Sequence, residues 1–260
     1  MNVFDIIGPI MIGPSSSHTA GACRIGNFAR IIFESLPSEV TLYFSGSFAK
    51  TYKGHGTDKA VVAGLLGFSA SDERLRDSLK LANEMGMKVT IKCEELELAH
   101  PNTVRIIANK TSRGKQNCMG EQNCRDEQNC RGEQNCMDEQ NCMGELCEPD
   151  DIMEVIGSSV GGGNILITRV NDVPLELDGM YDTFIITHKD IPGMITKITE
   201  VLSNHSINVN GLKLGRSEKG GEAVVVVQVD DDINDTVIFD ELKKLQDVSK
   251  VTYLKALKTL

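Results

Sequence analysis

The chain has 260 residues, of which 40% are hydrophobic and 25% charged, as expected for a folded protein of one large or two modest domains. Its formal net charge of −10 argues against a nucleic acid or an anionic membrane as partner, because an acidic surface repels both. No apolar run reaches the roughly 18–20 residues that span a bilayer, and the first residues lack a signal-peptide pattern, so we expect a cytoplasmic location.

The first predicted element is a turn that leads into a helix. Ser15, Ser16, Ser17 and His18, here called the serine turn, precede apolar residues that recur at helical spacing from position 22 to 36. A helix N-terminus offers free N–H groups and partial positive charge, so this turn can hold a carboxylate or a phosphate. The same pattern also fits a serine-rich helix cap beside a surface histidine.

A second turn with a histidine follows a strand that alternation predicts over 40–44. His55 is flanked by glycines, which let the backbone approach a ligand closely, and Thr57 and Asp58 lead into an apolar helix. An imidazole exchanges protons near neutral pH, so His55 is a candidate acid or base. Asp58 either orients this histidine or caps the helix.

Two more polar motifs accompany a polar helix over 72–85 and strands over 88–93, 103–108 and 164–170; a further ordered segment over 153–156 precedes the last of these strands. His100 and Asn102 come just before the second of these strands. Ser159, Gly161 and Gly162 lie in a glycine-rich turn before the third. Exposed N–H groups of such a turn can bind an anion, although a tight bend explains the glycines equally well.

Residues 115–148 break this pattern. A Gln-Asn-Cys-x-x-Glu unit recurs almost unchanged from Gln116 to Glu145, and the stretch contains one Leu and no Val, Ile, Phe or Tyr. It therefore cannot bury enough apolar area to offset its ordering entropy, so we expect a disordered insertion between two neighbouring strands. Cluster ligands normally come in tighter groups than one cysteine per six residues, so we expect no specific metal site here.

A second domain is predicted over 180–260, after a first domain over 1–179. Hydrophobic periodicity predicts a strand over 183–187, a helix over 193–204, strands over 207–214 and 223–230, a helix over 235–245 and a strand over 250–254. The order βαββαβ is the ferredoxin-like plan. The turn that carries His188, Asp190 and Gly193 resembles that of an ACT domain, which implies a small-molecule sensor or a dimerisation module.

Taken together, these motifs resemble the β subunit of the two-chain, iron–sulfur-dependent L-serine dehydratases over essentially the whole chain. The longest match runs from position 46 to 58, and the segment 3–9 also matches. The resemblance implies an α+β protein, with an α/β substrate-site domain like the allosteric substrate-binding domain of phosphoglycerate dehydrogenases, followed by the ACT domain. It also implies a lyase that converts L-serine to pyruvate and ammonia.

The resemblance further implies a partner α subunit whose cysteines ligate a [4Fe–4S] cluster, with no metal ligand in this chain. The catalytic residues would be His55, as the base, with Thr57 and His18. The residues that would bind the substrate come from four turns: Ser15, Ser16, Ser17, His18, His100, Asn102, Ser159, Gly161 and Gly162. His188, Asp190 and Gly193 would form a regulatory turn for an amino-acid effector, and ACT domains would pair into dimers.

Two rival interpretations stay open at this point. The first domain also resembles the allosteric module of some phosphoglycerate dehydrogenases, which would make the chain a non-catalytic sensor of anions or amino acids. A metal-storage protein built on the cysteine repeat would require stoichiometric metal on the isolated chain, and it leaves the histidine motifs unexplained.

Overall fold

The computed structural model describes residues 10–96, 100–110, 151–171, 173–216, 218–230, 233 and 237–256. The segment at 3–9 and the repeat at 115–148 lie outside these residues, so the expectations about them stay predictions. No helix in the described part of the chain is long and apolar enough to cross a membrane.

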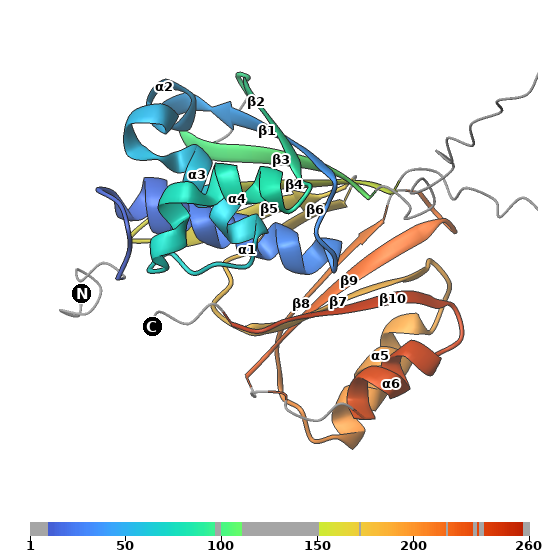
Figure 1. Ribbon diagram of the computed structural model, residues 1–260. Helices are drawn as coiled ribbons and strands as arrows, with labels where there is room; N and C mark the ends of the chain where they lie inside the picture. Colours follow the sequence, from blue (N-terminus) through green and yellow to red (C-terminus); the bar gives the residue numbers. More distant parts are fainter. Residues whose placement is uncertain are drawn as a thin grey trace, which may run out of the picture.

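The first half of the molecule is a six-stranded sheet with helices packed on one face (Figure 1). The strands lie in the order β2-β1-β3-β4-β5-β6, and among the described pairs only β1 and β2 run parallel. The strands are β1 (Glu39–Ser45), β2 (Lys88–Cys93), β3 (Asn102–Lys110), β4 (Asp151–Gly161), β5 (Asn164–Val170) and β6 (Val173–Leu177). The helices are α1 (Ala22–Phe33), α2 (Gly46–His55), α3 (Thr57–Leu65) and α4 (Ser78–Glu84).

Helices α1 and α3 touch backbone to backbone. A Cβ on Gly64 would lie 2.1 Å from the carbonyl oxygen of Cys23, and a Cβ on Gly26 would lie 2.2 Å from that of Val61. Only glycine permits such an approach, because no real Cβ comes so close to a backbone atom. The crossing holds the starts of both helices at the same end of the sheet (Figure 1).

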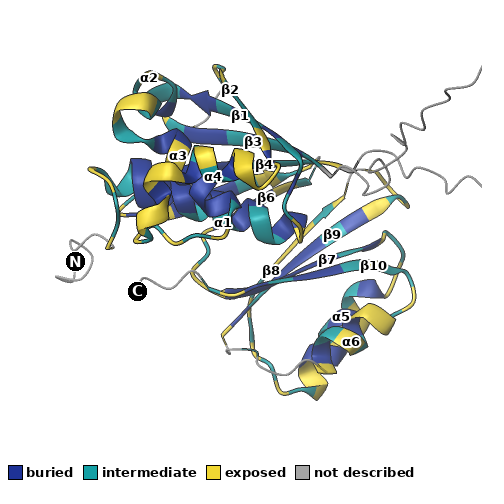
Figure 2. Cartoon of the chain, in the orientation of Figure 1, coloured by how far each residue is buried: buried dark blue, intermediate teal, exposed yellow. Residues whose placement is uncertain are grey.

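The second half is a four-stranded antiparallel sheet with α5 and α6 on one face, in the strand order β10-β7-β9-β8. Its elements are β7 (Asp182–Lys189), α5 (Met194–Asn204), β8 (Val209–Arg216), β9 (Glu222–Val229), α6 (Val237–Lys244) and β10 (Val248–Leu254). The predicted βαββαβ order is confirmed. Figure 2 shows the buried residues of this half concentrated between the sheet and the two helices.

The other face of the four-stranded sheet packs against the first half. Ile185, Val226 and Leu254 belong to the same apolar cluster as the core of the six-stranded half. Lys250 pairs with Glu34, which directly follows α1, at 3.3 Å, and Lys213 pairs with Glu176 on β6 at 2.8 Å. Apolar contact and ion pairs thus join the two halves.

The sequence misses two elements and merges two others. It does not predict α2 or β6, and the predicted polar helix is a short 3-10 turn, Glu73–Asp77, followed by α4. Lys110 and Asp151 are register partners on β3 and β4, so the prediction that the repeat connects two neighbouring strands is confirmed. The domain boundary at 179/180 stays a prediction, with β6 ending at Leu177 and β7 beginning at Asp182.

Candidate active site

The serine turn caps a widened helical turn that continues without a break into α1. The hydroxyl of Ser15 accepts a hydrogen bond from the backbone N–H of His18 at 3.3 Å and lies 3.2 Å from its Nδ1. Ser16–Gly21 is π-helical, where the sequence predicts an ordinary α-helical start. Single π-helical turns often occur at functional sites, and this one carries the predicted Ser16, Ser17 and His18.

The His18 side chain is buried against α2. Its Nε2 lies 3.3 Å from the hydroxyl of Ser47, and its ring contacts those of Phe48 and His55, with centroids 5.1 and 4.6 Å away. Burial, and secondly the proximity of His55, lowers the pKa of His18 below its usual range. His18 is therefore neutral at neutral pH. Its contact with His55 also shows that the serine turn and the turn at His55 meet in one place.

His55 lies at the end of α2, where the sequence analysis places it in a turn that starts a helix. Gly56, with φ of 68°, joins α2 to α3, which begins at Thr57. The Nδ1 of His55 and the hydroxyl of Thr57 are both buried without a hydrogen-bond partner among the described residues. Such atoms are places for a ligand or water. Asp58 lies in the first turn of α3, where its carboxylate accepts the N–H of Lys59 at 2.8 Å.

The other side of the candidate site is formed by the start of β3 and the end of β4. The side-chain amide of Asn102 donates to the carbonyl of Ser159 at 3.4 Å, and the backbone N–H of Asn102 donates to Nδ1 of the exposed His100 at 3.2 Å. The hydroxyl of Ser159 is buried and has no partner within the described part of the chain. It lies directly against Gly21, where a Cβ would come within 2.1 Å of it. Ser159 therefore faces the π-helical turn.

The predicted glycine turn is a tight hairpin between β4 and β5. Gly161, Gly162 and Gly163 all have positive φ, at 110°, 61° and 84°, a conformation that favours glycine. Arg24, in the first turn of α1, donates to the carbonyl of Gly163 at 2.7 Å. The hairpin is thus tied to the helix that carries the serine turn.

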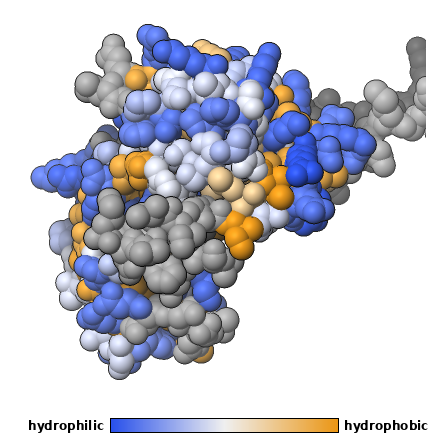
Figure 3. Space-filling model, turned by 90° about the vertical axis from the view of Figure 1, so that its left-hand side faces the viewer, coloured by the Kyte–Doolittle hydropathy of each residue, from blue (hydrophilic) through white to orange (hydrophobic). Residues whose placement is uncertain are grey.

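A cavity of about 300 Å³ opens beside His55. Its lining includes lysine and arginine side chains that the sequence analysis does not single out. It is lined by Ile12, Gly13, Lys53, Gly54, His55, Gly56, Lys59, Leu75 and Arg76. The three cationic side chains are exposed and attract an anion. Figure 3 looks onto this end of the molecule, where hydrophilic side chains dominate the upper part of the described surface.

Comparisons with known proteins identify the family of the chain. The family model described as serine dehydratase beta chain matches residues 2–137, and that of the AHAS small subunit-like ACT domain matches 184–250. A protein of Bacillus subtilis (strain 168) named probable L-serine dehydratase, beta chain, is 39% identical over 96% of both chains. The chain belongs to the serine dehydratase β-chain family.

Two further relatives bear on the rival interpretation. The L-serine dehydratase, beta chain, of Peptoniphilus asaccharolyticus is 31% identical over 91% of this chain and 90% of the relative. The D-3-phosphoglycerate dehydrogenase of a Synechocystis species is 28% identical over only 34% of this chain and 16% of its own length. Full-length similarity therefore favours the β-chain family over the phosphoglycerate dehydrogenase module.

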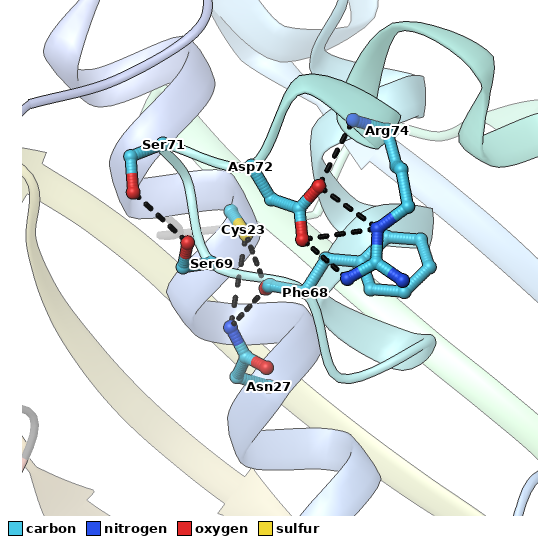
Figure 4. Close-up of polar contacts among 7 residues, drawn as sticks. All are labelled: Cys23, Asn27, Phe68, Ser69, Ser71, Asp72 and Arg74. Carbon is cyan, nitrogen blue, oxygen red and sulfur yellow. Dashed lines mark hydrogen bonds and ion pairs between the residues drawn. The ribbon is translucent and has the colours of Figure 1, made fainter.

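The described cysteines of this β chain do not fit an iron–sulfur cluster. Cys23 lies inside α1, where its thiol donates to the carbonyl of Phe68 at 3.3 Å and receives a bond from Asn27 (Figure 4). Burial raises the pKa of the Cys23 thiol to about 12, whereas a cluster ligand is a thiolate. In the described ranges, no group of three or more His, Cys, Asp or Glu residues is arranged to hold a metal ion.

In the predicted regulatory turn of the ACT domain, Asp190 already has hydrogen-bond partners within the same domain. The carboxylate of Asp190 accepts from the N–H of Gly220 at 3.0 Å and from Arg216 at 2.9 Å, which together hold its pKa below the usual range. Gly193, with φ of 89°, precedes α5. His188 is buried, and its Nε2 has no partner within the described residues. The role of this turn stays a prediction.

The lowered pKa of His18 predicts that acid destabilises the β chain. The unfolded state binds a proton at the ordinary pKa of 6.5, whereas the folded state resists it, so stability is lost as pH falls from 6.5 to the lower folded-state value. The melting temperature should therefore fall between about pH 7.5 and pH 5.5, and less so in His18→Gln. An equal fall in the melting temperature of the wild type and of His18→Gln would contradict a lowered pKa of His18.

Proposed function

We propose that this chain is the β subunit of an L-serine dehydratase, which deaminates L-serine to pyruvate and ammonia together with an α subunit. The observation that carries the proposal is the contact between His18 and His55, whose ring centroids lie 4.6 Å apart although their motifs are separate in the sequence. Family membership and the names of the full-length relatives support the same reaction.

The substrate carboxylate binds at the serine turn. The N-terminal end of a helix carries partial positive charge, and the hydroxyls of Ser15, Ser16 and Ser17 add donors there. The cations at the neighbouring cavity, Lys53 and Lys59 among them, strengthen the attraction for an anionic group. This arrangement directs the carboxylate towards the serine turn and the rest of the substrate towards His55.

His55 takes the proton from Cα of the substrate. Its neighbour His18 is neutral at neutral pH, so it does not repel the positive charge that His55 gains. The hydroxyls of Thr57 and Ser159, which have no partner among the residues that the structure describes, hold the amino group and close the pocket. Asn102 and His100 position the β4 side of the pocket. Gly161 and Gly162 have no side chains, so the backbone of the hairpin can approach the substrate closely.

The [4Fe–4S] cluster would be ligated by cysteines of the α subunit, as the resemblance to the two-chain dehydratases implies; the buried Cys23 of this chain, whose pKa is raised, is unsuited to bind it as a thiolate. When bound there, the cluster supplies a Lewis acid for the β-hydroxyl of serine. This chain contributes the carboxylate site, the base and the pocket walls. The active site therefore lies where the α subunit covers the serine turn and His55.

The ACT domain would pair with that of a second copy through β8. This strand lies at the edge of its sheet, and its side chains Leu212 and Leu214 are 40% and 52% exposed. An unpaired edge strand with exposed apolar side chains favours pairing with another strand. The turn at His188, Asp190 and Gly193 would take an amino-acid effector.

If the two subunits share the active site as proposed, pyruvate formation requires both of them. The purified chain alone should form no pyruvate from L-serine. Adding a cysteine-bearing α subunit anaerobically with iron should start pyruvate formation, because each chain holds half of the site. The α subunit alone with iron is the control.

Pyruvate formation by the isolated β chain would refute the division of labour. A stable α–β complex without any activity, even with iron, would instead favour the non-catalytic sensor. Stoichiometric metal on the isolated β chain would favour metal storage.

A further inference from the structure

Ser47, in the first turn of α2, brings a hydroxyl to the candidate site that no motif in the sequence indicates. Its Oγ lies 3.3 Å from Nε2 of His18, and the Oγ of Ser15 lies 3.2 Å from Nδ1 of the same ring. The His18 side chain is almost completely buried, with 8% of the residue exposed. Both nitrogens of this imidazole are therefore within hydrogen-bond distance of a hydroxyl.

The two hydroxyls fix the orientation of the His18 ring. A neutral imidazole has one N–H and one lone pair, and a hydroxyl can donate or accept, so a hydroxyl at each nitrogen matches either tautomer. Turning the ring by half a turn about its bond to Cβ would put carbon atoms in the places of both nitrogens. Both hydrogen bonds would then be lost, so the pair of hydroxyls selects one orientation.

Ser47 is itself held in place by the backbone at the start of α2. Its N–H donates to the carbonyl of Pro101 at 2.6 Å, and the N–H of Phe48 donates to the same carbonyl at 3.3 Å. Gly46, with φ of 58°, lies so close that a Cβ there would come within 2.5 Å of this oxygen. The first turn of α2 is thus pinned to the turn that precedes β3, and the Ser47 hydroxyl is presented to His18 from a fixed position.

The orientation of His18 matters for His55 because the two rings touch. Phe48 and His55 are seven residues apart on one face of α2, and the His18 ring contacts both of them. The Nδ1 of His55 is buried without a hydrogen-bond partner among the described residues. A loosely held His18 would be free to donate its N–H to a nitrogen of His55 and so occupy the lone pair of a base. With hydroxyls at both of its nitrogens, His18 leaves His55 unoccupied.

We propose that Ser47 is a positioning residue of the dehydratase reaction, which acts by holding His18 so that the lone pair of His55 stays free for the substrate proton. The proposal rests on the function proposed above for His55. Ser47 acts through His18, so its loss should slow turnover without weakening the binding of L-serine.

NMR spectroscopy of the isolated, ¹⁵N-labelled chain tests the contact without any catalysis. Long-range ¹⁵N–¹H spectra at neutral pH show which ring nitrogen carries the proton, and His18→Gln identifies the His18 signals. We expect Ser47→Ala to shift the Nε2 signal of His18. Ser203→Ala is the matched control, because Ser203 is an exposed serine in a helix of the ACT domain. It should leave the His18 signals unchanged.

Steady-state pyruvate assays of the reconstituted α–β enzyme test the role in turnover. Ser47→Ala should lower the turnover number about tenfold, the effect of losing one hydrogen bond that orients a group in the site. The Michaelis constant for L-serine should stay nearly the same, because the serine turn is intact. Ser47→Thr keeps a hydroxyl and should retain both the Nε2 signal and the turnover of the wild type. Alanine suits a helix, so the fold should persist in Ser47→Ala.

The outcomes separate this proposal from the one on which it rests. A wild-type α–β complex without activity would refute the dehydratase function, and the role of Ser47 in turnover with it. Unchanged His18 signals in Ser47→Ala would refute the contact alone. Wild-type turnover in Ser47→Ala, or equally slow turnover in Ser47→Ala and Ser47→Thr, would show that the hydroxyl does not position His18 for the reaction.

Discussion

Replacement of His55 by alanine lowers the turnover number of the reconstituted α–β enzyme by a factor of about 100 to 10,000, the usual contribution of a general base. His55 is the half-buried imidazole that lies 4.6 Å from His18 and lines the cavity with Lys53, Lys59 and Arg76. The Michaelis constant for L-serine should change much less, because the carboxylate site at the serine turn remains. Steady-state pyruvate assays measure both constants.

The control for this variant is a histidine outside the site. His205 lies in the ACT domain, where it pairs with Glu241 at 3.0 Å, so His205→Gln should leave turnover unchanged. His55→Gln, which keeps a polar side chain of similar size but cannot take up a proton, should be as slow as His55→Ala. Turnover close to that of the wild type in either His55 variant would remove His55 as the base.

Alanine in place of Gly64 lowers the free energy of unfolding by about 3 kcal/mol, at the upper end of ordinary overpacking effects. The added Cβ would meet the backbone carbonyl of Cys23 at 2.1 Å, and a backbone atom cannot move aside as a flexible side chain can. Alanine is otherwise the better helix former by up to about 1 kcal/mol, so the clash must exceed this gain. Urea unfolding measures the difference.

Gly54→Ala is the matched control for Gly64→Ala. Gly54 also lies in a helix, in the last turn of α2, but a Cβ there would meet no atom of the described residues within 4 Å. This variant should be as stable as the wild type or up to about 1 kcal/mol more stable. If Gly64→Ala matched Gly54→Ala in stability, the close crossing of α1 and α3 would be wrong.

The strands and the ACT topology are predictable because they depend on local patterns. Val40, Leu42 and Phe44 alternate with polar neighbours, and all three are buried, as a strand with one covered face requires. The βαββαβ half follows from periodicities of the same kind. By contrast, α2 has ten residues with glycines at both ends and only Phe48 buried, so no apolar stripe indicates a helix.

The contacts within the site are less predictable than its turns. The glycine-flanked histidine and the serine turn stand out in the sequence, but their meeting depends on the crossing of α1 and α3 at Gly26 and Gly64. Ser47 bonds His18 from a helix that the sequence does not predict. The cations at the cavity come from separate elements and form a group only in three dimensions.

The helix that begins at Ser16 connects the serine turn with the ACT domain. Six π-helical and twelve α-helical residues make one rod of roughly 25 Å, with His18 near its start and Glu34, bonded to the ACT domain, just after its end. If this rod moves as one body, a molecule that favours a different position of Glu34 changes the affinity for the proposed substrate at the far end. Because such coupling is reciprocal, the substrate changes the affinity for that molecule by the same factor.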